Sequence, residues 1–270
     1  MKKLLITDLD DTLYGWIDFF VPAFYEMAEE VVSITGIDKA QLLREYKERH
    51  QFYKSVEFPY VTLTLPSVVE KYKGCTQDEI KEILNEAFHR FNSVRKRELK
   101  LFPNVAETLK EWHDRGVTII GYTESSQENG FYRLGRLGIE EYFKFVYVSD
   151  SMYEAKYPIS SKIKRITTKK PDTEILAKIC ADENCELCDV VYVGDSITKD
   201  MYMAYMAGVT SVWYKKSVNN EEYYSMLDDI TSWSDADFER ERQLKEIWER
   251  EQMQSDYEIS DFKALKDIVF

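Results

Sequence analysis

Short, uninterrupted apolar runs alternate with stretches of helical periodicity along this chain of 270 residues. Three runs, at residues 4–6, 117–122 and 190–193, have the length and the continuous hydrophobicity of strands buried on both faces. Between them, apolar residues recur every three or four positions, which is typical of amphipathic helices. This order of strands and helices predicts an α/β fold with a mostly parallel sheet.

Residues 15–98 differ from the rest of the chain because they are largely helical in their pattern of apolar positions. We therefore predict a core domain, residues 1–14 and 99–270, and a smaller α-helical domain, residues 15–98. The helical spacing is clearest in two groups of residues: Phe24, Met27, Ala28, Val31 and Val32 in the first, and Ile80, Ile83, Leu84, Ala87 and Phe91 in the second.

Two further segments extend the core beyond a simple alternation of strands and helices. Residues 149–169 are predicted to form a long loop that is basic towards its end. Residues 218–255 are acidic and rich in charge, with a helix predicted over 239–254. Because residues 257–259 resemble a last short strand of the sheet, we interpret 218–255 as an insert within the core.

The first apolar run leads directly into three acidic residues, Asp8, Asp10 and Asp11. Side chains two positions apart on an extended chain point to the same side, so Asp8 and Asp10 are expected to face one site. Like charges at close range raise each other's pKa, so these carboxylates require a positive partner. We expect that partner to be a metal cation or a lysine from elsewhere in the chain.

Polar residues also follow the other predicted strands. Thr123 ends the second apolar run, and Asp195 follows the third, with Asp200 five residues beyond it. Lys170 stands just before a predicted helix. Because ligands of open α/β sheets bind outside the carboxyl ends of the strands, we expect these side chains to converge on one crevice.

Taken in order, these motifs resemble the four motifs of the haloacid dehalogenase superfamily. The resemblance covers residues 1–14 and 99–215, and it implies a three-layer, doubly wound, Rossmann-like core in which residues 15–98 form an α-helical cap domain. The matching segments are Asp8-Leu9-Asp10-Asp11-Thr12 for the first motif, Thr123 for the second, Lys170-Pro171 for the third, and Gly194-Asp195 with Asp200 for the fourth.

The resemblance also implies an activity: a Mg²⁺-dependent phosphatase that hydrolyses a small phosphorylated metabolite through an aspartyl-phosphate intermediate. Asp8 is then the nucleophile, and Asp10 protonates the leaving alcohol before it takes a proton from the attacking water. Thr123 and Lys170 are implied to bind the phosphoryl group. An acid at position 10 implies phosphatases and phosphomutases, and not the dehalogenases or the ion pumps of the superfamily.

The implied metal ligands are all oxygen atoms, which Mg²⁺ prefers. They are the Asp8 carboxylate, the backbone carbonyl of Asp10 and the Asp195 carboxylate, with Asp200 assisting through water. One departure from the family pattern is Glu124, which stands where many relatives have Asn. Because an inward carboxylate would repel phosphate, we expect Glu124 to turn away or to pair with a cation.

Other readings of the motifs stay open. A phosphomutase shares the same residues, and a non-catalytic interaction protein would retain the fold. A phospho-receiver domain also joins acids, Thr and Lys at strand ends, but there the order differs, because here Asp195 follows Lys170. The substrate is a nucleoside monophosphate, a sugar phosphate or a similar metabolite, which the motifs do not distinguish.

Charge and hydropathy narrow the partners. The chain carries 36 basic and 49 acidic residues, a net charge of −13, which argues against nucleic acid or an anionic membrane as a main partner. Asp8 comes too early for a signal peptide, and the apolar runs are too short to span a membrane, so we expect a cytoplasmic protein. The sequence leaves the oligomeric state open.

Overall fold

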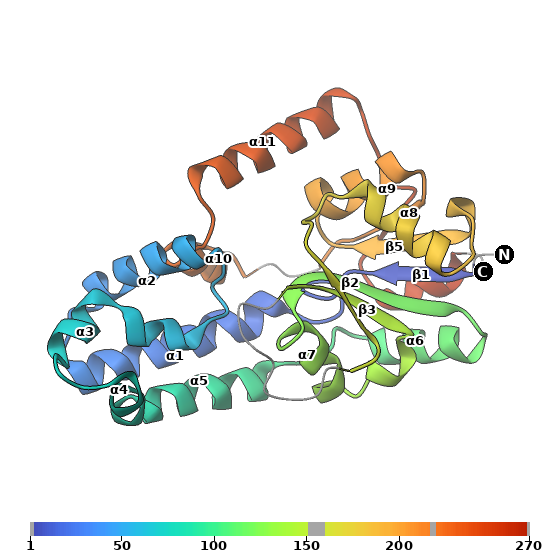
Figure 1. Ribbon diagram of the computed structural model, residues 1–270. Coiled ribbons are helices and arrows are strands. Elements are labelled where there is room, and N and C mark those ends of the chain that lie inside the picture. Colours follow the sequence, from blue (N-terminus) through green and yellow to red (C-terminus); the bar gives the residue numbers. More distant parts are fainter. Residues whose placement is uncertain (1–2, 151–159, 217–219, 269–270) are drawn as a thin grey trace. The chain divides into compact units, whose positions relative to one another are not determined.

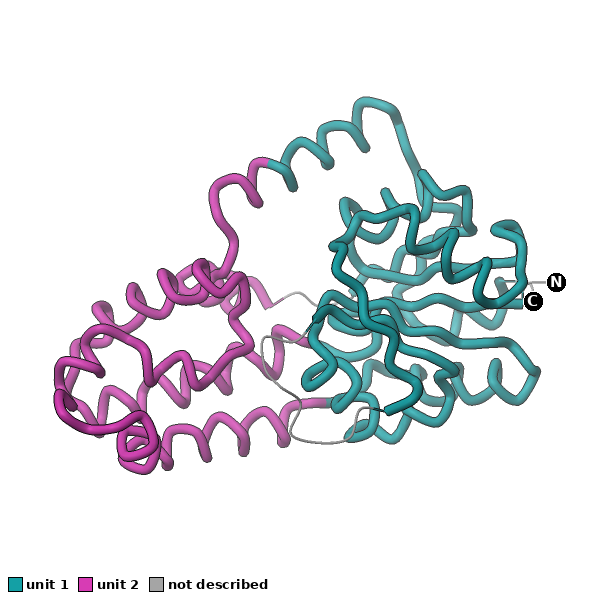
Figure 2. Tube along the Cα trace, viewed as in Figure 1, with its two compact units in different colours: residues 1–15, 100–218, 240–270 teal, residues 16–99, 219–239 magenta. Residues whose placement is uncertain are grey.

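The computed structural model describes residues 3–150, 160–216 and 220–268 (Figure 1). The chain separates into two compact units, which Figure 2 distinguishes by colour. The first contains residues 1–15, 100–218 and 240–270, and the second contains residues 16–99 and 219–239. Within the described residues, no helix is both long and apolar enough to cross a membrane.

The first unit is built on a parallel sheet, which confirms the predicted α/β fold. In the described part of the chain the sheet has seven strands in the order β4-β3-β2-β1-β5-β6-β7, and every neighbouring pair is parallel. The strands are β1 (Leu4–Thr7), β2 (Thr118–Ser126), β3 (Phe145–Ser149), β4 (Ile163–Ile166), β5 (Val190–Gly194), β6 (Thr210–Tyr214) and β7 (Tyr257–Ile259).

Helices cover both faces of this sheet because the strand order reverses direction next to β1. From β1 to β3 the chain moves towards one edge, through α6 (Val105–Asp114) and α7 (Gly130–Arg136). From β4 to β6 it moves towards the other edge, through α8 (Thr173–Asp182) and α9 (Tyr202–Ala207). Right-handed crossovers therefore place the two pairs on opposite faces (Figure 1), which is the predicted three-layer, doubly wound arrangement.

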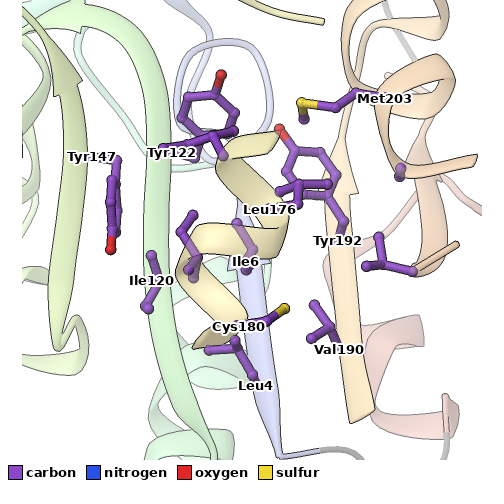
Figure 3. Close-up of a cluster of buried hydrophobic side chains, with 14 of the residues drawn as sticks. Leu4, Ile6, Ile120, Tyr122, Tyr147, Leu176, Cys180, Val190, Tyr192 and Met203 are labelled. Carbon is purple, nitrogen blue, oxygen red and sulfur yellow. The ribbon is translucent and has the colours of Figure 1, made fainter. Parts of the chain in front are cut away.

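The core explains why the strand runs are apolar without alternation. One cluster of buried side chains lies between the sheet and helices α8 and α9 (Figure 3) and includes Ile6, Ile120 and Leu176. On the opposite face Leu5 and Trp112 are also fully buried. A strand covered on both sides requires apolar residues at every position. Figure 3 shows Tyr122 and Tyr192 at one end of the cluster and Leu4 at the other.

Short helical turns complete the first unit. They are η2 (Glu140–Tyr142), η3 (Leu187–Asp189), the π-helical turn η4 (Ile197–Met201) and η5 (Phe262–Asp267), and the unit also holds most of α11 (Asp235–Arg250).

Strand β4 corrects the prediction of one long loop over residues 149–169. Residues 163–166 pair with β3, with Val146 opposite Ile163 and Ser149 opposite Ile166. Lys164 and Arg165 on this edge strand are exposed, so its pattern lacks the continuous apolar run of a central strand. Residues 151–159 of the predicted loop lie outside the described residues.

The second unit is entirely helical in its described residues. Helix α1 packs along α5 and also contacts α2 and α10. Its elements are α1 (Trp16–Thr35), α2 (Lys39–Tyr53), η1 (Pro59–Thr64), α3 (Pro66–Lys71), α4 (Gln77–Ile83), α5 (Asn85–Glu98), α10 (Glu221–Asp228) and the beginning of α11.

Residues 219–239 belong to this helical unit, whereas the sequence pattern led us to assign the whole of 218–255 to the core. Helix α10 and the turn after it are tied to α1 and α2 by hydrogen bonds. The Tyr25 hydroxyl donates to the Met226 carbonyl at 2.8 Å, and the Lys47 ammonium donates to the Asp228 carbonyl at 2.9 Å. The local sequence pattern of residues 219–239 does not indicate these long-range hydrogen bonds.

A buried histidine of α2 makes a third hydrogen bond to the segment 219–239. His50 is 1% exposed, and its Nδ1 donates to the Ile230 carbonyl at 2.7 Å. Its ring lies 5.6 Å from that of Phe24 and 5.7 Å from that of Tyr46. Burial among these rings lowers the pKa of His50 from 6.5 to about 4, because the charged imidazolium loses hydration.

We predict that His50 makes the protein acid-sensitive. Its pKa is lower in the folded state, so the unfolded chain binds the proton first as the pH falls. The stabilisation is full above pH 6.5 and is lost as the pH falls towards about 4. Between pH 7 and pH 4.5 the free energy of unfolding should drop by about 2 to 3 kcal/mol less in His50→Gln than in the parent, measured by urea titration. His113→Gln, with a half-exposed side chain, is the control and should behave as the parent.

Candidate active site

The predicted site residues gather at the carboxyl ends of three adjacent strands of the first unit. Asp8 directly follows β1, Asp195 follows β5, and Thr123 lies in β2, which is the other neighbour of β1. The Asp8 backbone N–H donates to the Val193 carbonyl at 2.9 Å, so the pairing of β1 with β5 continues up to Asp8. The site therefore lies beside the point where the strand order reverses, as open α/β sheets favour.

Each of the three acids after β1 is paired with a different cation. Asp8 Oδ1 lies 2.6 Å from Lys170 Nζ. Asp10 Oδ1 lies 2.7 Å from Arg133 Nη1, and Asp11 Oδ1 lies 2.6 Å from Lys216 Nζ. The expected positive partner is thus present for all three, and each comes from a part of the chain distant from β1.

Lys170 joins two carboxylates in a buried position. Its side chain is 3% exposed, and its Nζ lies 2.6 Å from Asp8 Oδ1 and 2.8 Å from Asp200 Oδ1. The rings of Tyr122 and Tyr192 flank the ammonium at 4.9 and 5.7 Å. Burial by itself lowers the pKa of Lys170, but the attraction of Asp200 and Asp8 outweighs it and raises the pKa above 10.5, so the lysine stays charged.

Asp200 is itself held by the turn after β5. Its Oδ1 accepts a hydrogen bond from the Tyr192 hydroxyl at 2.7 Å, and its Oδ2 accepts one from the Ser196 N–H at 3.1 Å. The π-helical turn η4 brings Asp200 back over the end of β5. A Cβ atom at Gly194 would overlap the Asp200 carboxyl group, so only glycine fits there.

Asp10 faces the end of β2. Its Oδ2 accepts hydrogen bonds from the Ser125 hydroxyl at 2.7 Å and from the Thr123 hydroxyl at 3.2 Å. The pairing of β2 with β3 shifts between Tyr122 and Ser126, and this irregularity coincides with the segment that contacts Asp10.

Glu124 pairs with a cation, as expected. Its Oε2 lies 2.7 Å from Lys199 Nζ, and its Oε1 accepts a hydrogen bond from the Lys170 N–H at 3.2 Å. Successive side chains on an extended strand alternate in direction, which explains why Glu124 contacts lysines while Thr123 and Ser125 contact Asp10.

Three carboxylates in the described part of the chain are placed to hold a metal ion. Ligand oxygens of Asp8, Asp195 and Asp200 all lie within 4.8 Å of one another. Burial, with further repulsion from Asp200 and Asp195, raises the pKa of Asp8 well above its usual value, although Lys170 opposes this. Burial, with repulsion from Asp11 and Asp200, raises the pKa of Asp195 to about 7. A largely buried group of carboxylates, with oxygen as the only kind of ligand atom, fits a hard divalent cation.

Five residues of this site were not among those predicted from the sequence: Ser125, Arg133, Tyr192, Lys199 and Lys216. Ser125 had a signal, because it stands two positions after Thr123 and so shares its side of the strand. The cations had none, because a Lys or Arg in a helix or loop is ordinarily solvated.

Comparisons of the sequence with known proteins gave two informative matches. A family model described as "Haloacid dehalogenase-like hydrolase" matches residues 5–214. A curated protein, "Glyceraldehyde 3-phosphate phosphatase" from Methanopyrus kandleri, is 23% identical over 250 residues, which are 92% of this chain and 97% of that protein.

Solved structures show the same fold at low sequence identity. A 2-haloacid dehalogenase from Pseudomonas syringae has a TM-score of 0.53 at 22% identity, with 99% of this chain and 98% of that chain covered. An HAD phosphatase from Thermococcus onnurineus has a TM-score of 0.54 at 16% identity, with 98% and 97% covered. A Bacillus subtilis HAD-hydrolase bound to magnesium has a TM-score of 0.53 at 15% identity, with 99% and 98% covered.

The family model extends from the strand that carries Asp8 to the end of β6, and so includes all the motifs of the site. This confirms the resemblance that the motifs indicated, and with it an enzyme of the hydrolase class. The chain belongs to the family of haloacid dehalogenase-like hydrolases.

Proposed function

We propose that this protein is a Mg²⁺-dependent phosphatase that hydrolyses a small phosphorylated metabolite through an aspartyl-phosphate intermediate. The observation that carries the proposal is the buried contact of 2.6 Å between Asp8 Oδ1 and Lys170 Nζ at the end of β1. A carboxylate fixed by an ammonium group is oriented for attack on phosphorus, and the same ammonium attracts a phosphoryl oxygen. The name of the Methanopyrus relative supports a phosphate ester as substrate.

Two steps of substitution at phosphorus then follow from the residues present. An oxygen of Asp8 forms a bond to phosphorus while the ester P–O bond breaks, and Asp10 gives its proton to the leaving alcohol. Water then attacks the phosphorus of the aspartyl-phosphate, Asp10 takes a proton from that water, and Asp8 is released with inorganic phosphate. Thr123 donates a hydrogen bond to the phosphoryl group, and Lys170 neutralises part of its charge.

The residues that would hold Mg²⁺ are the carboxylates of Asp8 and Asp195 and the backbone carbonyl of Asp10, with Asp200 assisting through water. The fit rests on the largely buried carboxylate oxygens described above. When bound, the ion supplies positive charge that offsets the repulsion between the Asp8 carboxylate and the phosphoryl oxygens. The magnesium in the Bacillus subtilis structure supports this choice of metal.

The substrate class is a small metabolite, with triose phosphates the first to test because of the name of the Methanopyrus relative. Sugar phosphates and nucleoside monophosphates belong in the same panel. The net charge of −13 opposes the approach of an anion, so attraction of the phosphate depends on the local cations. We also propose that residues 16–99, with the helical segment 219–239, act as the cap that selects among these substrates.

We predict that turnover requires both Asp8 and the divalent ion. Asp8→Asn keeps the shape of the side chain but removes the attacking charge, so release of inorganic phosphate should fall at least about a thousandfold. Chelation with EDTA should abolish turnover, and Mg²⁺ should restore it.

Asp78→Asn, on an exposed part of the second unit, is the matched control and should retain the parent rate. Near-parental turnover in Asp8→Asn would contradict the nucleophile assignment. An isomerised sugar phosphate formed faster than inorganic phosphate, with a bisphosphate activator present, would instead make the protein a phosphomutase.

The negative charge of Glu124 would oppose phosphate binding, and Lys199 neutralises it. Its carboxylate approaches the Lys170 backbone at 3.2 Å, and Lys170 also contacts the nucleophile, so an uncompensated charge there would repel an incoming phosphate. Lys199, with 30% of its side chain exposed, lies 2.7 Å from that carboxylate and neutralises it.

We therefore predict that Lys199→Met raises KM for a phosphate ester about tenfold with little change in kcat, because it leaves Glu124 unpaired. Removing both charges in Lys199→Met/Glu124→Gln should return KM to within about twofold of the parent. The exposed pair Lys215–Glu258, at 2.6 Å, gives the control, and Lys215→Met should not change KM. An unchanged KM in Lys199→Met would refute the compensation.

A further inference from the structure

Both oxygens of the Asp10 carboxylate are held, and by donors of different chemistry. Arg133 Nη1 contacts Oδ1 at 2.7 Å, while the hydroxyls of Ser125 and Thr123 donate to Oδ2 at 2.7 and 3.2 Å. The same Nη1 also donates to the Ser125 hydroxyl at 3.2 Å. Contacts on both oxygens fix the plane of the carboxylate as well as its position.

Arg133 is buried, which is unusual for an arginine in a helix. Its side chain is 4% exposed, although Arg136 on the same helix is exposed. Its guanidinium carbon lies 6.0 Å from the centre of the Tyr14 ring. Burying a guanidinium group costs free energy unless it is paired with an anion. Arg133 can therefore be buried here only because it contacts Asp10.

The close approach of α7 to β2 places Arg133 beside Asp10. Gly130, at the start of α7, has no Cβ, and an added one would lie 3.1 Å from the Thr123 methyl carbon and 3.3 Å from the Ser125 Cβ. Glycine therefore lets α7 lie directly against the strand end that carries both hydroxyls. From there, one helical turn brings Arg133 over Asp10.

The two kinds of donor treat a proton on Asp10 differently. Arginine has only N–H donors and keeps its charge, and a protonated carboxyl oxygen is a much weaker acceptor than a carboxylate oxygen, so a proton on Oδ1 would weaken its bond to Arg133. The hydroxyls of Ser125 and Thr123 can rotate to accept a hydrogen bond from an O–H on the other oxygen. The two sets of contacts therefore favour a proton on Oδ2, because the contact of Oδ1 with Arg133 is then kept.

We propose that Arg133 is the positioning residue for the acid and base Asp10: it holds Oδ1 and so confines proton transfer to Oδ2. The inference rests on the proposed phosphatase function, in which Asp10 protonates the leaving alcohol. It assigns a role to a residue outside the four motifs, on a helix that contributes no other group to the site in the described residues.

The test compares an ester that needs a proton with one that does not. Glycerol 3-phosphate releases a poor leaving group, whereas 4-nitrophenyl phosphate releases a stable anion. Arg133→Gln should lower kcat/KM about 10- to 100-fold for glycerol 3-phosphate, and less than about threefold for 4-nitrophenyl phosphate. Asp10→Asn should show the same selectivity with a larger loss. Arg133→Lys should recover part of the activity on the alkyl ester, and the control Arg136→Gln should match the parent.

Equal losses on both esters in Arg133→Gln, or no loss on either, would overturn the proposal. If Arg133→Gln does not fold, Arg133→Lys decides by the same comparison, because it keeps the buried charge but not the shape of the guanidinium. The Asp8→Asn variant distinguishes a failure of the Arg133 role from a failure of the phosphatase mechanism. If Asp8→Asn is inactive while Arg133→Gln shows no leaving-group selectivity, only the role of Arg133 fails; if Asp8→Asn is active, the phosphatase mechanism itself fails.

Discussion

The site depends on gathering carboxylates in a buried place, where each needs a positive partner. Asp8, Asp195 and Asp200 bring ligand oxygens within 4.8 Å of one another, and Lys170 contacts both Asp8 and Asp200. Burial, with repulsion from Asp11 and Asp200, raises the pKa of Asp195 to about 7. Carboxylate oxygens gathered in this way are ligands of the kind that a hard divalent cation prefers.

The sheet keeps these charges away from the hydrophobic core, because the charged residues lie at the carboxyl ends of the strands and the core packs along the strands themselves. The central strands change from apolar to polar towards their carboxyl ends, as at Val193 followed by Gly194 and Asp195. Buried side chains on both faces hold β2, β1 and β5 in register, so their ends deliver Thr123, Asp8 and Asp195 to one edge. The tyrosines at the end of the cluster in Figure 3 connect the two regions, since Tyr192 packs in the core and donates to Asp200.

Around this centre the other charges are neutralised in pairs. Arg133 faces Asp10, Lys216 faces Asp11, and Lys199 faces Glu124. Each pair is at least partly buried, so breaking one leaves a charge with little water to stabilise it. In this way an acidic chain gathers positive charge locally, from cations that tertiary contacts supply.

The sequence by itself determined the α/β fold, the central strands and the motif residues, because continuous apolar runs and the polar residues that end them are local patterns. The identity of the cations that pair with Asp10, Asp11 and Glu124 was decided only by the tertiary structure. So were strand β4 and the attachment of residues 219–239 to the helical unit. An exposed edge strand has no continuous apolar run, and a lysine or arginine has the same local pattern whether solvated or paired. The roles of Arg133, Lys199 and Lys216 depend on contacts with residues more than 70 positions away in the chain. An example is the contact of Lys199 with Glu124, which local spacing does not encode.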